Sequence, residues 1–269
     1  MTQLNIALFQ AAPGARTVDR ALADLDAAMR RAIDRKADLL VTPELYLSGY
    51  GDASTAIAAA QGANSEVLSA AAQMAAYHGI GLVLGYPERD GVNLFNSAAV
   101  FDRRGVQLHN YRKVALPNDF ERGCFQSGNG PQVFEFEGVR CSVVICYDVE
   151  FPELPRRAAK LGAELLIVPT ALRRIWRIVS DSVVPTRAYE NAMFVAYCDY
   201  ARHSSESEFS GASAVCGPDG ARRTVETGQS GMVFSSINTD EIARHRMEFD
   251  LLSDLTDPHS IAARLFQYA

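Results

Sequence analysis

The sequence predicts an α/β fold, and three of its features carry that prediction. Apolar runs of strand length alternate with segments in which apolar residues recur every three or four positions, as in packed α/β layers. Hydrophobic residues make up 48% of the 269 residues, which is enough for a sizeable core. No Ser/Gly/Pro-rich linker or charge block divides the chain, so residues 1–269 are expected to form one domain, with 240–269 as a tail at a subunit contact.

The individual elements follow from turn residues and capping residues. Strands are expected at 4–11, 39–42, 81–86, 93–101, 106–111, 132–137, 139–145, 165–168, 193–197, 212–216 and 231–237. Helices are expected at 18–36, 65–78, 153–161 and 181–190. Thr17 is the expected N-cap of the first helix, and Gly79 is expected to end the second. Residues 137–138 predict a tight hairpin turn, and residues 113–121 are expected to form a loop.

Charge and composition narrow the class of partner. The net charge of −6 and the lack of any basic run argue against nucleic acid. No apolar stretch is long enough to cross a bilayer, and residues 1–9 do not have the cationic lead of a secretion signal. These observations predict a cytoplasmic protein whose partners are small molecules or other protein chains. Its five scattered cysteines lack the spacing of a zinc site or a disulfide scaffold, so reduced thiols are expected.

Cys146 is the first candidate for chemistry. It comes at the end of the apolar run 143–145, and Pro152 is placed to open the helix that follows. A thiol at such a strand-to-helix turn can be reached by a ligand and can act as a nucleophile. The alternative is that Cys146 is a small buried hydrophobic residue, as most unpaired cysteines are.

Two more polar residues have the same placement as Cys146, because Glu44 and Lys113 also follow expected strands. Strand ends from one sheet or from two facing sheets can converge on one pocket. There, a carboxylate can deprotonate the thiol, and an ammonium can stabilise both the thiolate and an oxyanion. Taken singly, Glu44 could be a cap and Lys113 a solvated surface lysine. The sequence contains no zinc-protease, serine-hydrolase or nucleotide-binding motif, so no metal or organic cofactor is expected.

Around these residues the sequence resembles the carbon-nitrogen hydrolase (nitrilase) superfamily. The matching segments are LVTPE at 40–44, YRKV at 111–114, CYDVEFPE at 146–153 and RAYEN at 187–191, with Phe194 and Val195 farther on. They occur in the family's order, and the resemblance runs from about residue 5 to about residue 237. Several ordered motifs are more specific than any single one.

The resemblance implies a role for each matching residue. Cys146 would be the nucleophile, Glu44 the general base and acid, and Lys113 the stabiliser of the tetrahedral intermediate, helped by the backbone N–H of Tyr147. Glu121, eight residues beyond Lys113, would position the substrate and the lysine. The resemblance also implies an αββα sandwich that pairs into an αββααββα homodimer or a higher homo-oligomer.

The residue after the cysteine indicates which branch of the family the chain resembles. Tyr147, directly after the cysteine, is similar to amidases, and the chain resembles bacterial aliphatic amidases such as 5-aminopentanamidase and R-stereoselective amidase most. This implies hydrolysis of small aliphatic primary amides, including ω-amino amides, whose amine could pair with Glu150 or Asp119 unless these are solvated loop charges. Trp176, in the basic segment 171–177, is expected in the pocket wall or at a subunit contact.

Alternative functions and one alternative structural interpretation remain open. A nitrilase or an N-carbamoyl amide hydrolase would share Glu44, Lys113 and Cys146 and differ in pocket shape. A non-catalytic binding homologue would have no chemical need to keep all three reactive groups. The polar segment 202–208 could be a second rim of the pocket or plain exposed loop.

Overall fold

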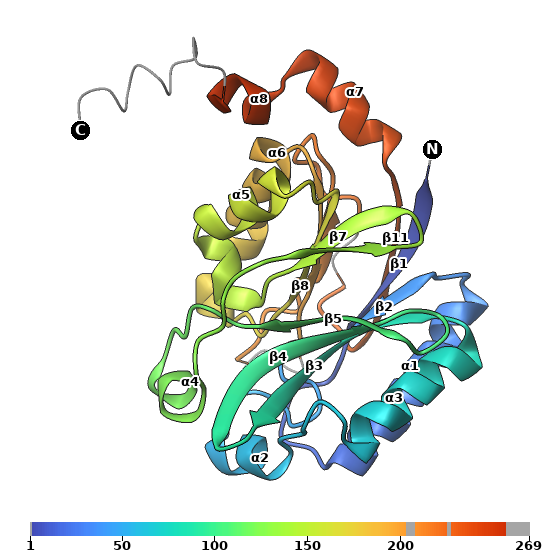
Figure 1. The fold of residues 1–269 in the computed structure, drawn as a ribbon, viewed down its shortest axis with the longest axis vertical. Coiled ribbons are helices and arrows are strands. Elements are labelled where there is room, and N and C mark those ends of the chain that lie inside the picture. The colour runs from blue at the N-terminus through green and yellow to red at the C-terminus, as the bar shows by residue number, and fades with distance from the viewer. Residues whose placement is uncertain (1, 203–207, 225–226, 257–269) are drawn as a thin grey trace.

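The computed structural model describes residues 2–202, 208–224 and 227–256, and its centre is two facing β-sheets (Figure 1). The six-stranded sheet has the order β11 (Gly231–Asn238), β1 (Gln3–Gln10), β2 (Leu39–Val41), β3 (Gly81–Asp90), β4 (Asn93–Phe101) and β5 (Gln107–Arg112). The five-stranded sheet has the order β10 (Ala214–Cys216), β9 (Phe194–Cys198), β8 (Leu165–Pro169), β7 (Val139–Val143) and β6 (Val133–Phe136).

Helices cover the outer faces of both sheets. Helices α1 (Val18–Asp34) and α3 (Glu66–His78) lie on the six-stranded sheet, and α5 (Glu153–Lys160) and α6 (Val184–Glu190) lie on the other (Figure 1). The short helices α2 (Ala53–Ala58) and α4 (Asp119–Cys124) flank the strand ends, and α7 (Asp240–Glu248) and α8 (Leu251–Thr256) follow the last strand. The layers therefore run α, β, β, α, which confirms the predicted sandwich; the dimer stays a prediction.

The parallel strands at the centre of each sheet decide where a site can form. In the first sheet β1, β2 and β3 are parallel, and in the second β7, β8 and β9 are parallel. Buried apolar side chains from both inner faces, such as Leu8, Val41, Val143 and Ile167, make one core between the sheets. Because the carboxyl ends of parallel strands meet at one edge, the loops that follow them gather there.

Local signals account for most element boundaries. The Thr17 hydroxyl accepts the N–H of Arg20 at 3.3 Å as the N-cap of α1, and Gly79 ends α3 with a φ of +64°. Glu137 and Gly138 both have positive φ, as the predicted two-residue hairpin turn requires.

The expectation of a loop over 113–121 is wrong at its end, because α4 begins at Asp119. Its cap is Asn118, whose side-chain oxygen accepts the Glu121 N–H at 2.9 Å. The expected tail is also partly helical, since α7 and α8 occupy much of residues 240–256; residues 257–269 lie outside the described part of the chain. Residues 203–207 of the segment at 202–208 lie outside it too. None of the described helices has the length and apolar character needed to span a membrane.

Candidate active site

The three candidate residues follow strands of the two facing sheets. Glu44 is in the loop after β2, Lys113 directly follows β5, and Cys146 begins a 3₁₀ turn (Cys146–Glu150) shortly after β7. The first two loops belong to the six-stranded sheet and the third to the five-stranded sheet. The candidate site therefore lies at the junction of the sheets.

Lys113 lies between two carboxylates. Its Nζ is 2.6 Å from Oε1 of Glu44 and 2.8 Å from Oε1 of Glu121, and all three side chains are fully buried. Asn96 of β4 donates from Nδ2 to Glu44 at 2.7 Å and to Glu121 at 3.3 Å. The alternative interpretation of Lys113 as a solvated surface residue is therefore wrong, and Glu44 is not an exposed loop cap.

The charges of this cluster favour a proton acceptor at neutral pH. Burial, with a further contribution from Glu121, raises the pKa of Glu44 to about 7, although Lys113 opposes the shift. Burial alone would lower the pKa of Lys113, but the two carboxylates raise it above its ordinary value, so the ammonium stays charged. Among the described residues, Oε2 of Glu44 has no hydrogen-bond partner, and this oxygen is free to take a proton.

The Cys146 turn is held in a conformation that side chains seldom adopt. Cys146 has a φ of +46°, which costs on the order of 1–3 kcal/mol and needs support from its surroundings. Asp148 supplies that support, since its carboxylate accepts the N–H of Ile145 at 3.1 Å and that of Ala115 at 2.8 Å. Asp148 also accepts the Tyr111 hydroxyl at 2.8 Å. One buried side chain thus joins the cysteine turn to the chain that follows Lys113.

Cys146 is a partly exposed residue that lines a pocket, and the pKa of its thiol is raised well above the ordinary value. Burial is the largest cause, the negative charge of Glu44 adds to it, and Lys113 opposes it. The resting side chain is therefore a neutral thiol, and ionising it requires a base that is already in place.

A cavity of about 420 Å³ opens onto Cys146. Its apolar wall is made by Pro117, Ala171, Leu172 and Trp176. Besides Cys146, five polar residues complete the lining: Tyr50, Asn118, Tyr147, Glu150 and Arg173. The structure thus brings the sequence-predicted Tyr147, Glu150 and Trp176 to the same pocket as Cys146, and Trp176 remains 58% exposed at its rim.

The two acidic residues considered for substrate binding differ in position. Asp119 is fully exposed, pairs with Arg122 at 2.9 Å and is not part of the cavity lining. Glu150 lines the cavity and is partly buried, and its carboxylate has no hydrogen bond or ion pair within the described residues. Burial raises the pKa of Glu150, while Lys113 and Arg187 oppose that shift.

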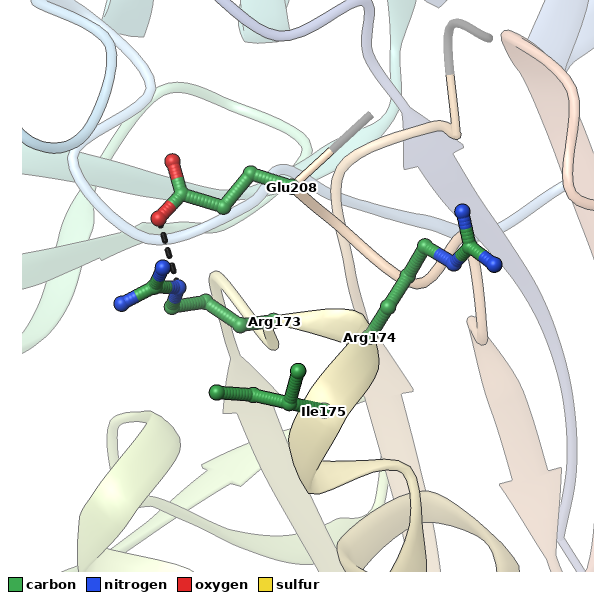
Figure 2. Close-up of a pocket in the computed structure, with 4 residues that line it drawn as sticks. All are labelled: Arg173, Arg174, Ile175 and Glu208. Carbon is green, nitrogen blue, oxygen red and sulfur yellow. Dashed lines mark ion pairs between the residues drawn. The ribbon is translucent and has the colours of Figure 1, made fainter. Parts of the chain in front are cut away.

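Arg173 lines both this cavity and a second hollow, whose other lining residues are Arg174, Ile175 and Glu208 (Figure 2). Figure 2 shows the side chains of Arg173 and Glu208 pointing toward each other, and their Nε and Oε1 atoms are 2.5 Å apart. The backbone N–H of Arg174 also donates to the carbonyl of Glu208 at 2.8 Å. The basic segment 171–177 therefore forms part of the pocket mouth and is tied there to the loop that carries Glu208.

Sequence reasoning missed several polar residues of this site, and Tyr50 and Asn96 are the two that contact the acidic cluster directly. Tyr50 donates its hydroxyl to Oε1 of Glu121 at 2.6 Å and accepts the side-chain N–H of Asn118 at 2.8 Å. Tyr50 lies in a turn-rich segment without periodicity, so no pattern marked it. Asn96 could have been found, because a lone amide within the apolar run of β4 needs a buried partner.

The arrangement can carry out nucleophilic acyl chemistry. It offers a thiol at a small cavity and, buried next to it, a carboxylate with a pKa near neutrality and a fixed positive charge, both of which act electrostatically on that thiol. No group of three or more His, Cys, Asp or Glu side chains that could hold a metal ion occurs among residues 2–202, 208–224 and 227–256.

Comparisons with known proteins agree with this chemistry. A family model described as carbon-nitrogen hydrolase matches residues 5–246. The "hydrolase in pqqF 5'region" of Pseudomonas protegens is 36% identical over 93% of this chain and 88% of its own length. An (R)-stereoselective amidase of Pseudomonas sp. is 30% identical over 81% of this chain and 79% of its own.

Solved structures give the same result. The crystal structure of an amidase from Nesterenkonia sp. superposes with a TM-score of 0.79 at 32% identity, over 91% of this chain and 94% of that one. Other structures of that amidase, with similar scores, are mutant complexes with acrylamide and with butyramide, and one carries acrylamide added to its active-site cysteine.

Proposed function

Because this chain belongs to the carbon-nitrogen hydrolase family and is an amidase within it, we propose that it hydrolyses short aliphatic primary amides to a carboxylic acid and ammonia. The observation that carries the proposal is the buried Glu44–Lys113–Glu121 cluster behind Cys146 at the cavity. Such a cluster supplies a base, an oxyanion partner and a nucleophile in one place, with no cofactor in any step.

The first half of the reaction forms a thioester. Oε2 of Glu44 takes the Cys146 proton while the sulfur attacks the amide carbon, and the carbonyl π electrons move to oxygen. Lys113 and the backbone N–H of Tyr147 stabilise this oxyanion. Glu44 then gives its proton to the amide nitrogen, the C–N bond breaks, and ammonia leaves.

The second half returns the enzyme to its starting state. Water enters the position of the departed ammonia, Glu44 removes its proton, and the resulting hydroxide attacks the thioester carbon. A second oxyanion collapses, the C–S bond breaks, and Glu44 returns the proton to Cys146. A carboxyl pKa of about 7 suits both directions of transfer, because acid and base forms coexist at neutral pH.

The size of the cavity supports a small substrate. A volume of about 420 Å³ that includes the approach to Cys146 leaves room for an acyl group of a few carbons. The acrylamide and butyramide complexes of the Nesterenkonia amidase, which has the same fold, support the same size range.

The position of Glu150 favours a substrate that has a positive charge at its far end. Its unpaired carboxylate faces the cavity that contains Cys146, and a bound ammonium would satisfy it. Leu172 and Trp176 provide apolar surface along the intervening methylene chain. We therefore include ω-amino amides in the proposed substrate class, with Glu150 as their anchor.

A panel of C2 to C6 primary amides, each tested with and without a terminal amine, ranks these substrates by ammonia release. We expect turnover of the short amides and a lower KM when a terminal amine is present. The matching nitriles and N-carbamoyl compounds test the alternative activities by their products. Intact mass of trapped protein should show an acyl adduct on Cys146; ammonia release without any adduct, or no release from the whole panel, would contradict the proposal.

We also propose the homodimer that the resemblance implies, with α5 and α6 as the contact elements. Three large apolar side chains on or beside these helices are exposed, namely Phe151, Leu161 and Tyr189. Light scattering should give twice the chain mass of 29.3 kDa, and charged substitutions at Leu161 and Tyr189 should reduce the measured mass to that of one chain.

A further inference from the structure

Two buried hydroxyl groups, those of Thr170 and Tyr197, belong to the same five-stranded sheet as the turn that carries Cys146. Strands β7, β8 and β9 are parallel neighbours, so Cys146 after β7 and Thr170 after β8 come at the same edge of the sheet. Oγ1 of Thr170 is 3.1 Å from the hydroxyl of Tyr197 on β9. Both side chains are fully buried, so their hydroxyls find their partners within the protein.

Thr170 acts on the nucleophile as well as on Tyr197. The Thr170 side chain and the backbone N–H of Ala171 both favour the ionised Cys146 sulfur and lower its pKa, against the larger opposite effect of burial. The backbone carbonyl of Thr170 accepts the N–H of Glu44 at 3.4 Å, and the Thr170 N–H donates to the Cys198 carbonyl at 2.8 Å. These backbone bonds fix the position of Thr170 at the edge of the sheet, next to Glu44, while its hydroxyl can still rotate between Tyr197 and the sulfur.

A chain of two hydroxyls can respond to the charge of the sulfur. Each hydroxyl has one proton to donate and two lone pairs to accept with. Beside a neutral thiol, Thr170 can donate to Tyr197; beside a thiolate, Thr170 can donate to the sulfur while Tyr197 donates to Oγ1. Both hydroxyls keep their protons throughout, because the proton lost by the thiol goes to Glu44.

We propose that Tyr197 and Thr170 form a hydroxyl chain that stabilises the Cys146 thiolate, with Thr170 as the catalytic donor and Tyr197 as its positioning residue. The inference rests on the proposed function, since it needs Cys146 to be the nucleophile. Burial keeps the pKa of Tyr197 well above its ordinary value, so this hydroxyl remains a donor across the working pH range. A donor to an ionised group contributes more than a neutral hydrogen bond, roughly a 10- to 100-fold effect.

Other charged or titratable groups also face the sulfur. They are Glu44 after β2, Lys113 after β5, Tyr50 and the turn residue Glu150. Because substitutions at Thr170 and Tyr197 leave all four in place, a shift in the behaviour of Cys146 can be assigned to the hydroxyl chain.

The test measures alkylation of Cys146 by iodoacetamide as a function of pH, with mass spectrometry to identify the modified cysteine. Thr170→Val keeps the shape of the side chain and removes the hydroxyl, Thr170→Ser keeps the hydroxyl, and Tyr197→Phe keeps Thr170 but removes its donor. We expect Thr170→Val to slow alkylation at neutral pH roughly 10- to 100-fold and to move the profile to higher pH. Thr170→Ser should stay within a few-fold of the wild type, and Tyr197→Phe should show a smaller loss than Thr170→Val.

The outcomes separate this inference from the proposed function. Alkylation of a cysteine other than Cys146 would overturn the nucleophile itself. Equal profiles for wild type and Thr170→Val, with Cys146 modified in both, would overturn the hydroxyl chain alone, as would a loss in Thr170→Ser as large as in Thr170→Val. Equal losses in Thr170→Val and Tyr197→Phe would mean that the Thr170–Tyr197 hydrogen bond matters only for packing. That result would also overturn the proposed hydroxyl chain. Thermal unfolding of each variant identifies any that fails to fold, and Tyr197→Phe and Thr170→Ser then still decide the case.

Discussion

Replacing Lys113 with Met tests the centre of the site, because it removes the ammonium that lies 2.6 Å from Glu44 and 2.8 Å from Glu121. Two costs to turnover follow from these distances. Loss of one oxyanion donor lowers kcat by about 10²- to 10³-fold. Without the ammonium, nothing of that charge opposes burial and the neighbouring Glu121, which raise the pKa of Glu44, so Glu44 is protonated at neutral pH and can no longer accept a proton from Cys146. We expect a loss in kcat/KM of at least about 10³-fold.

The same substitution should make stability depend strongly on pH. Breaking a buried ion pair by removing one partner costs about 3–5 kcal/mol while both carboxylates are charged. When the pKa of a carboxyl group is higher in the folded state than in the unfolded state, its protonated form contributes to stability at low pH. That contribution is lost as the pH rises through the pKa of the folded state. In the wild type this window runs from 4.5 to about 7 for Glu44; in Lys113→Met it should extend to higher pH. Thermal unfolding should therefore show a small deficit at pH 5 and a large one at pH 8.

The matched control is Lys36→Met, which alters an exposed lysine just beyond the end of α1. It should leave both turnover and the pH dependence of unfolding unchanged. Near wild-type turnover in Lys113→Met would refute the role of the ammonium at the oxyanion. A full stability deficit at pH 5 would refute the expected protonation of Glu44 in this variant.

Three further predictions concern single groups of the site. The kcat/KM of the wild type should fall about tenfold per pH unit below about 7, because the reaction needs the charged form of Glu44; a flat profile between pH 5 and 7 in steady-state assays would argue against this base. Glu150→Gln should raise KM roughly tenfold for ω-amino amides and leave uncharged amides of equal length unchanged, which initial-rate comparison of the two series measures. Tyr50→Phe removes the 2.6 Å hydrogen bond to Glu121 and should lower kcat roughly 3- to 10-fold with little change in the unfolding temperature; an unchanged kcat would mean that Glu121 needs no such support.

Much of the fold was predictable because it depends on local pattern. The strand that ends before Cys146, the cap at Thr17 and the turn at 137–138 all depend on a few adjacent residues. The six-residue helix α4 was missed, although Asn118 with Glu121 three residues later is a helix-start signature. A helix of fewer than two turns has too short an apolar pattern to be recognised by periodicity.

The burial of Lys113 could not be predicted by local reasoning. Its side chain is charged, and lysines are mostly exposed, so nothing in 106–114 alone indicates an interior position. Burial becomes favourable because Glu44, 69 residues away, and Glu121 supply two negative charges at hydrogen-bond distance. The resemblance to a family pointed to these residues, whereas the physical reason for their burial appears when the loops of the fold meet.

The position of the site at the junction of the sheets links its geometry to the packing of the whole sandwich. Glu44 belongs to one sheet, yet the hydroxyl of Tyr200, which follows β9 in the other, donates to its backbone carbonyl at 2.9 Å. Thr170 accepts the Glu44 N–H from the same side, and Asp148 joins the cysteine turn to Ala115 beyond Lys113. These bonds run from the second sheet's loops to the base and to the lysine segment. A relative shift of the sheets would therefore move base and nucleophile apart, so substitutions that loosen the intersheet core should lower turnover before they unfold the protein.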